Sequence, residues 1–405
     1  MPDVSASVVQ SLVDAGAVPL GKTNMDQFAT GLVGVRSPEP WGPCNNALNP
    51  QYISGGSSSG SAVAVSKQWV SFALGTDTAG SGRVPASFNN IVGLKPTRGL
   101  LSTRGVVPAC RSLDVVSIFA LTVADANSVL DCAAVFDAGD PYSRHNSFDN
   151  GRRYFAAPAA PLRIGVPPAE HLQFFGDDAA AGCFSAAVER IQGEGHELVP
   201  MDMEPFIEAA GLLYSGPWVA ERYLVVQDLL EQSPESVLPV IREIIGAGGG
   251  YAATDTFTAM YRLQALCQRA RPLMDSVDLM VTPTAGTCYR TEEVLEEPVR
   301  LNTNLGYYTN FMNLMDYSAL ALPVGFLPSG VGFGVTLFHQ AFSDKRLLGA
   351  GAALQRLFDL PLGASGRRSP GTAESARLPA STSVELVVCG AHLSGQPLNW
   401  QLTER

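Results

Sequence analysis

Apolar positions recur along the chain with two different periods, which divide most of it into expected helices and strands. Helical spacing predicts helices over residues 5–15, 122–136, 178–193, 217–231, 254–274 and 343–358. Short apolar runs predict strands at 17–20, 163–166, 279–282, 320–324 and 333–338. This alternation, without an internal repeat, predicts an α/β fold in which helices cover both faces of a large mixed β-sheet.

A change in composition near Gly363 predicts a domain boundary. Residues 363–383 are rich in Gly, Ser, Ala and Pro and lack aromatic side chains, as interdomain linkers do. We therefore expect one domain over 1–362 and the start of a second over 384–405, a stretch too short to form its own core. Because a helix precedes the first expected strand, the first domain is predicted to be N-terminally incomplete.

Composition and charge narrow the possible partners. The chain has 405 residues and a formal net charge of −11, which argues against a nucleic-acid partner, because phosphate binding needs clustered Lys and Arg. Its seven cysteines are dispersed without a C-x-x-C pair, which suits a reducing compartment. With no signal peptide and no apolar stretch of about 20 residues, we expect a cytoplasmic protein that does not enter a membrane. No metal-ligand cluster or nucleotide loop is apparent, so no cofactor is expected.

Two Gly/Ser-rich loops carry the chemistry of this sequence. They read GGSSSGS at 55–61 and GTDTAGSGRVP at 75–85, and the first leads into the apolar run 62–65, which favours a buried helix over a flexible linker. Small residues let the backbone approach a substrate closely and expose N–H groups. A serine there can attack a carbonyl only if a base removes its proton. On the residues alone, tight turns or phosphate-binding nests remain open, and no histidine lies nearby in sequence.

These two loops, with AGAVPLGKTN at 15–24 and GLKPTRG at 93–99, closely resemble the amidase signature family. The resemblance extends over roughly residues 5–360 and implies a Ser–cis-Ser–Lys triad that hydrolyses amides. By motif, Ser81 corresponds to the nucleophile. Ser57 corresponds to the bridging serine, whose preceding peptide bond is cis in the family.

The resemblance also assigns an oxyanion hole and its supports. The donors that it implies are the backbone N–H groups of Thr78, Ala79, Gly80 and Ser81. Asp77 and Arg83 flank the nucleophile and are interpreted as orienting this loop, because charges beside a dry site must be paired. The alternative for Asp77 and Arg83 is a local salt bridge of little consequence.

The third member of the triad has no counterpart in this sequence. The family's lysine base lies well upstream of the bridging serine, and none of the four lysines, at positions 22, 67, 95 and 345, matches it. Lys22 and Lys95 fit other family positions that are structural, and the position of the base would precede Met1. We therefore expect low or no activity from the chain as it stands.

The substrate is suggested by a narrower resemblance, to the allophanate hydrolase branch of the family. It is carried by residues 26–38, 212–223, 300–326 and 387–399, and it implies hydrolysis of allophanate, a carboxylated urea, during urea degradation. Within 212–223, it assigns substrate binding to Tyr214 and Arg222. Their spacing of eight residues is about 80° around a helix, so both can line one side of a pocket. The alternative is a surface arginine beside Glu221 and a packed tyrosine.

The same resemblance suggests partners and leaves other functions open. It suggests a homodimer and a pathway link to a biotin-dependent urea carboxylase. The alternatives are another amidase, an A-type component of a glutamine amidotransferase, or an inactive truncated remnant that keeps the scaffold.

Overall fold

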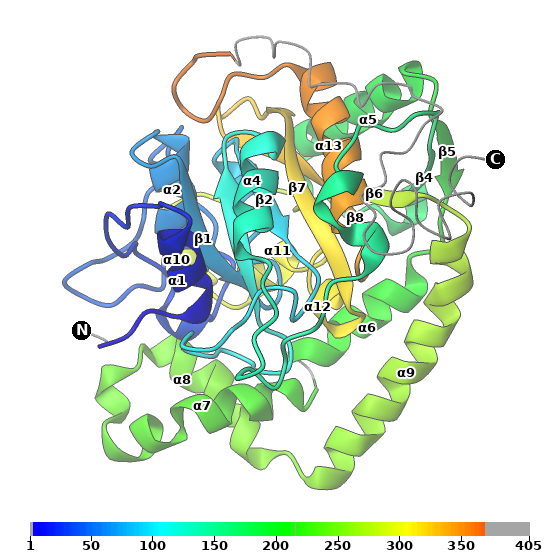
Figure 1. Ribbon diagram of the computed structural model, residues 1–405. Coiled ribbons are helices and arrows are strands. Elements are labelled where there is room, and N and C mark those ends of the chain that lie inside the picture. Colours follow the sequence, from blue (N-terminus) through cyan, green and yellow to red (C-terminus); the bar gives the residue numbers. More distant parts are fainter. Residues whose placement is uncertain (1–2, 215, 369–405) are drawn as a thin grey trace, which may run out of the picture. The chain divides into compact units, whose positions relative to one another are not determined.

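The computed structural model describes residues 3–214 and 216–368 of the chain (Figure 1). The compact unit that contains them extends to Ser369. Most of the predicted linker and all of the predicted second-domain start lie outside the described residues, so the domain limits stay a prediction. The first linker residues pack on the large domain: the Ala364 N–H donates to the Ser66 carbonyl at 2.9 Å.

Eight strands of the described residues form one sheet, which Figure 1 shows running through the middle of the fold. Their bounds are β1 Phe72–Asp77, β2 Val92–Lys95, β3 Val115–Ala120, β4 Arg163–Val166, β5 Glu197–Pro200, β6 Leu279–Pro283, β7 Tyr317–Phe326 and β8 Gly332–Gln340. Their order across the sheet is β1-β3-β2-β7-β8-β6-β4-β5. Strand β4 pairs in parallel with β5 and β6, whereas the other pairs are antiparallel, which confirms the predicted mixed sheet.

Helices pack on both faces of this sheet, as predicted. Their bounds are α1 Ser7–Asp14, α2 Ser59–Ser66, α3 Val84–Phe88, α4 Val123–Ala133, α5 Asp178–Gly193, α6 Glu204–Tyr214, α7 Trp218–Gln232, α8 Pro239–Gly246, α9 Ala253–Asp275, α10 Thr291–Glu296, α11 Arg300–Leu305, α12 Phe311–Leu314 and α13 Asp344–Phe358. Successive side chains of a strand point to opposite faces. Accordingly, Leu320 of β7 packs in the core cluster that holds α4 and α13, whereas Ala319 packs in the one that holds α6, α9 and α12.

The apolar periodicity located the long elements well and one short segment wrongly. Helices α5, α7, α9 and α13 and strands β4 and β6 begin and end within one residue of the predicted limits. The predicted strand at 17–20 is instead irregular. Its Val18 and Leu20 are 78% and 73% exposed, because no neighbouring strand pairs with this segment.

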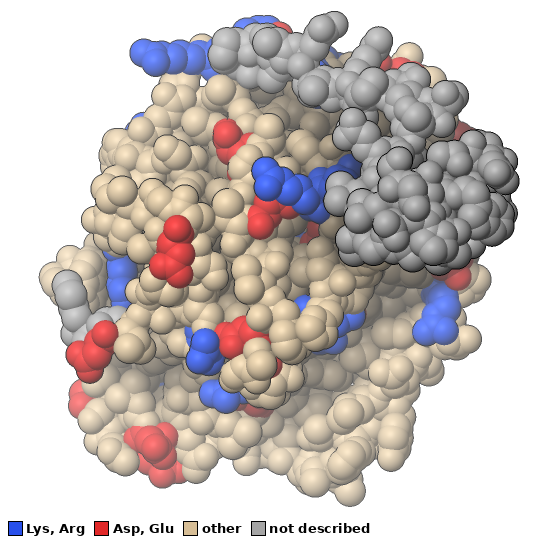
Figure 2. Space-filling view, viewed as in Figure 1, with Lys and Arg blue, Asp and Glu red and all other residues tan. Residues whose placement is uncertain are grey.

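The described part of the face in Figure 2 has no continuous patch of one charge. Basic and acidic side chains are scattered there singly or in mixed groups. Among the helices of residues 3–214 and 216–368, none is both long and apolar enough to cross a membrane.

Candidate active site

The fold brings the two serine loops together at one end of β1. Ser57 lies in the loop that leads into α2, whose residues are all buried, as expected for a helix that follows the Gly/Ser run. Ser81 lies in the turn between β1 and α3. The Ser58 hydroxyl donates to the Thr76 carbonyl and accepts from the Thr76 N–H, both at 3.2 Å, and so ties the first loop to the strand that leads to Ser81.

Ser57, the predicted bridging serine, is fixed through its backbone, and its hydroxyl has no partner among the described residues. The Gly56–Ser57 peptide bond is cis, as the resemblance implied. The Ser57 carbonyl accepts from the Asp26 N–H at 3.0 Å. The Ser57 hydroxyl is buried and has no hydrogen-bond partner in the described part of the chain, so no bond joins it to Ser81 there. Catalytic hydrogen bonds often tighten only when substrate is bound, and a serine hydroxyl rotates freely about its bond to Cβ.

Around Ser81, the predicted nucleophile, one of the four backbone N–H groups predicted as oxyanion donors is engaged by another residue. The Gly80 N–H is already engaged, because it donates to Asp77 Oδ1 at 2.8 Å. The N–H groups of Thr78, Ala79 and Ser81 have no acceptor among residues 3–214 and 216–368. Glycine is required at position 80 because a side chain does not fit there. Its φ is +135°, and a Cβ at this position would lie 2.5 Å from Thr309 Oγ1.

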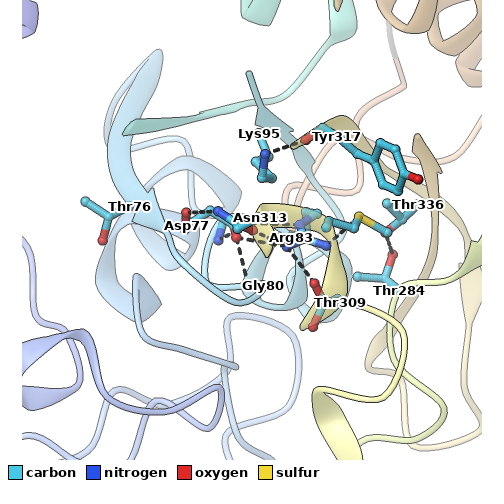
Figure 3. A network of polar contacts seen from close by, with 12 residues as sticks. Thr76, Asp77, Gly80, Arg83, Lys95, Thr284, Thr309, Asn313, Tyr317 and Thr336 are labelled. Atoms are coloured by element: carbon cyan, nitrogen blue, oxygen red, sulfur yellow. Dashed lines mark hydrogen bonds and ion pairs between the residues drawn. The ribbon is translucent and has the colours of Figure 1, made fainter. Parts of the chain in front are cut away.

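Asp77 and Arg83 form a buried pair that holds this loop, as Figure 3 shows. Arg83 Nε donates to Asp77 Oδ2 at 2.8 Å and Nη2 donates to Oδ1 at 2.9 Å, and both side chains are fully buried. The remaining guanidinium N–H groups reach the Thr309 carbonyl and Met312 Sδ. Burial by itself raises the pKa of Asp77, but the charge and hydrogen bonds of Arg83 outweigh it and lower the pKa. This geometry favours the predicted orienting role over the alternative of a local salt bridge of little consequence, and the role stays a prediction.

Replacement of Arg83 by methionine should destabilise the fold by about 3–5 kcal/mol, because it leaves the Asp77 carboxylate buried and unpaired. The measurement is the free energy of unfolding in urea. A matched control is Arg262→Met, which breaks an exposed pair with Glu208 and should change stability by less than about 1 kcal/mol. Equal losses in the two variants would contradict a structural role for the buried pair.

None of the four lysines reaches the bridging serine. Lys22 and Lys67 are exposed, and Lys345 Nζ donates to Asn127 and Asp131. Burial lowers the pKa of Lys95 to about 8, which suits a base, but its Nζ donates to the Tyr317 carbonyl at 2.5 Å (Figure 3). None of these four lysines therefore donates to Ser57, and the missing base stays a prediction.

Arg222 is a buried cation that forms no direct ion pair with the described residues. It is 2% exposed, which excludes the surface arginine considered as the alternative. Its Nε and Nη1 have no hydrogen-bond partner, and no carboxylate lies within ion-pair distance of it, in the described ranges. Burial alone lowers its pKa, but Tyr214, Cys110, Asp114 and Glu221 raise it above the ordinary value. Unpaired guanidinium N–H groups in a dry site are a ready anion-binding site.

Tyr214 lies beside Arg222, but not for the reason that the spacing suggested. The argument from about 80° around one helix is wrong, because α6 ends at Tyr214 and α7 begins only at Trp218. The two residues meet across this break, with Arg222 Cζ 5.4 Å from the centre of the Tyr214 ring. Tyr214 also packs against the core cluster that is built largely from α6, α9 and α12 and that includes Ala79.

A second carboxylate, Asp26, supports the bridging serine and was not singled out in the sequence. Its Oδ1 accepts from the Arg36 N–H at 2.7 Å and its Oδ2 from the Gly34 N–H at 3.0 Å. A Cβ on Gly56 would lie 2.1 Å from Asp26 Oδ2, so the carboxylate lies directly against the cis peptide of Ser57. The resemblance at 26–38 covered this residue, but its contact with residue 57 is a tertiary one.

Asp26 should make the stability of the fold depend on pH. Burial is the main cause that raises its pKa from 3.8 to about 6. The folded state therefore keeps the proton after the unfolded chain has lost it. This contribution to stability is complete below about pH 4 and disappears as the pH rises through 6, a loss of roughly 3 kcal/mol. The measurement is urea unfolding between pH 4 and 7. The free energy of unfolding of the wild type, minus that of Asp26→Asn, should fall as the pH rises. A difference that stays constant over this range would contradict the assignment.

Comparison with known proteins identifies the family. Residues 1–348 match the family described as Amidase. The A-type component of the glutamyl-tRNA(Gln) amidotransferase of Neisseria meningitidis is 32% identical over 381 residues, which cover 87% of this chain and 77% of that protein. Together with the cis Gly56–Ser57 bond and the two serine loops, these matches show that the chain belongs to the amidase family.

Relatives with higher identity are named for urea or for allophanate. Urea amidolyase of Saccharomyces cerevisiae is 42% identical over 99% of this chain and 22% of its own length. The structure of Kluyveromyces lactis allophanate hydrolase matches with a TM-score of 0.88 and 40% identity, over all of this chain and 66% of that one. The chain thus spans about a fifth of the length of the urea amidolyases that it matches.

Proposed function

We propose that this chain is the amidase part of an allophanate hydrolase, with Ser81 as the nucleophile and Arg222 as the anchor for the substrate carboxylate. The observation that carries the proposal is the buried guanidinium of Arg222, which lies beside Tyr214 and whose Nε and Nη1 have no hydrogen-bond partner among the described residues. An amidase that acted on neutral amides would gain nothing from a desolvated positive charge there, because such a charge is costly unless an anion pairs with it. The similarity to urea amidolyase and allophanate hydrolase supports the same substrate.

The proposed reaction uses the groups that the fold brings together. Ser81 Oγ attacks the terminal carbonyl of allophanate, while its proton passes through Ser57 to a base. The oxyanion is stabilised by the free N–H groups around Thr78, Ala79 and Ser81. Protonation of the leaving nitrogen releases ammonia and leaves an acyl group on Ser81. Water then hydrolyses this ester to N-carboxycarbamate, which loses carbon dioxide in a later step.

The base is the part of this proposal that the chain does not supply. By resemblance to the family, it is a lysine on a strand that precedes the bridging serine. We call the 405-residue chain, preceded by such a family segment, the lysine-supplied chain. A desolvated lysine amine can be neutral near pH 7 and accept the proton that Ser57 relays.

The proposed substrate is distinguished from the main alternative by a comparison of two amides. The lysine-supplied chain should release ammonia from allophanate with a kcat/KM at least about 10²-fold above that for glutamine, because only allophanate places a carboxylate next to the reacting urea group. A preference for glutamine would favour the A-type amidotransferase component, and no release from either would favour an inactive remnant.

The remaining expectations stay part of the proposal. A carboxylated urea requires a preceding carboxylation of urea, and the names of the urea amidolyase relatives agree with a link to a biotin-dependent urea carboxylase. A homodimer and a cytoplasmic location are proposed on the family resemblance and on the dispersed cysteines of the sequence.

A further inference from the structure

A short buried turn at residues 109–114 lies between the anion site and the nucleophile loop. It is closed by the N–H groups of Leu113 and Asp114, which donate to the Cys110 carbonyl at 2.8 and 2.9 Å. Cys110 is fully buried and Asp114 is 6% exposed. We refer to it as the 109–114 turn.

One end of this turn holds the nucleophile loop. Thr78 Oγ1 donates to Asp114 Oδ1 at 2.5 Å, and the same carboxylate accepts from the N–H groups of Ala109 and Cys110 at 2.8 and 3.1 Å. Burial raises the pKa of Asp114, although these hydrogen bonds and the charge of Arg222 oppose it. A carboxylate in a dry site with three donors has little freedom to move, so it fixes the side chain of Thr78.

The other end of the turn is held by α7, beside Arg222. Glu221 Oε1 accepts from the Ser112 N–H at 2.7 Å, and Oε2 accepts from the Ser112 hydroxyl at 2.5 Å. The Cys110 thiol donates to Glu221 Oε2 at 3.1 Å. The residue after Glu221 on the helix is Arg222, so the backbone that carries the proposed anion anchor is tied directly to the turn.

We propose that the 109–114 turn couples the anion site on α7 to the nucleophile loop, with Asp114 as the positioning residue. The inference rests on the proposed function, because it assumes that an anion pairs with Arg222. An anion bound to Arg222 restricts the motion of α7. Because Glu221 of α7 is hydrogen-bonded to the 109–114 turn, the motion of the turn is restricted as well. Because Asp114 of the turn is hydrogen-bonded to Thr78, the nucleophile loop is held in the same way. The substrate carboxylate and the three N–H donors that are free in the described chain thereby keep fixed positions relative to each other, which is what an oxyanion site requires.

The coupling is tested by hydrogen exchange, which needs no turnover. The probe is malonate, a small dicarboxylate, added to the 405-residue chain, and the readout is amide exchange in peptides that cover residues 78–81. We expect malonate to slow this exchange by about tenfold. In Asp114→Asn the slowing should be lost, while malonate still binds to Arg222 as measured by calorimetry.

Asp140→Asn is the matched control. Like Asp114, Asp140 is 6% exposed and accepts from a threonine, through the N–H of Thr103 at 2.7 Å and its hydroxyl at 3.2 Å. Among the described residues, its side chain accepts hydrogen bonds only from Ser102, Thr103 and Tyr142 and from none of residues 78–81 or α7, so its variant should keep the slowing. If Asp114→Asn fails to fold, Thr78→Val, which removes the hydroxyl donor at nearly constant volume, should lose the slowing in its place.

Each outcome decides the question. Malonate binding with full slowing in Asp114→Asn or Thr78→Val would overturn the coupling and leave the proposed function standing. Loss of slowing in Asp140→Asn as well would also overturn it, because a general loosening of the fold would then explain the effect. Failure of the wild type to bind malonate would overturn the anion site, and with it both the coupling and the proposed substrate.

Discussion

Ammonia release from allophanate should be at least about 10³-fold faster in the lysine-supplied chain than in the 405-residue chain alone, because loss of one triad member commonly lowers the rate by several orders of magnitude. The structural reason is the Ser57 hydroxyl, which is buried and has no partner among the described residues. Lys95, whose pKa of about 8 would suit the task, donates to the Tyr317 carbonyl instead.

Two controls separate this effect from a general stabilisation by the added segment. The same segment with methionine in place of its lysine should restore no activity, although it adds the same strand. Ser81→Ala in the lysine-supplied chain should abolish the gain. Comparable turnover by the 405-residue chain, abolished by Ser81→Ala, would mean that another residue serves as the base.

Replacement of Arg222 by lysine should lower kcat/KM for allophanate by about 10²-fold in the lysine-supplied chain, mainly through KM. Lysine keeps the positive charge but loses the planar pair of N–H donors that a carboxylate meets at two points. The reason to expect a large effect is burial: the guanidinium is 2% exposed, with Nε and Nη1 unpaired in the described chain. Steady-state ammonia release is the measurement.

Biuret is the matched substrate for this test, because it carries a neutral amide where allophanate carries the carboxylate. Its kcat/KM should change by less than about threefold in Arg222→Lys, since no charge pairs with the arginine. An unchanged KM for allophanate, or an equal loss for both substrates, would exclude the carboxylate anchor.

The long elements of the fold were predictable because each contains its own signal. Helix α5 and strand β4 begin and end where the apolar spacing placed them. The segment at 17–20 shows the limit of this approach: it has the composition of a strand, but pairing decides whether a strand forms, and no strand of the described residues pairs with it. Strands β1, β2, β3 and β5 were not predicted. Strand β1 is rich in small and polar residues, so its pairing with β3 identifies it, whereas β3 is itself an apolar run and was overlooked.

The parts of the site that lie within a sequence motif were predictable. The parts that form where segments distant in sequence meet were less so. The cis bond before Ser57 and the buried pair of Asp77 and Arg83 follow from the two loops. The hydrogen bond from the Gly80 N–H to Asp77, by contrast, could not be predicted from the two loops. For Tyr214 and Arg222, Gly216 and Pro217 were the local signal that one helix could not hold both.

Asp114 had no such signal. Its bond to Thr78 joins residues 36 positions apart, and Ser112 of the same turn bonds to Glu221 of α7, 109 positions further on. Asp26 is similar, because a motif does not say which peptide its carboxylate will touch. Contacts of this kind depend on how the elements pack, which local sequence patterns do not encode.

The most direct test of the central claim is to trap the acyl group. The lysine-supplied chain is mixed with allophanate, quenched in acid within the first turnover, and mapped by peptide mass spectrometry. We predict an adduct on the peptide that contains Ser81, absent in Ser81→Ala and reduced in Arg222→Lys. Turnover with an adduct on another residue, or turnover that survives Ser81→Ala, would contradict the account.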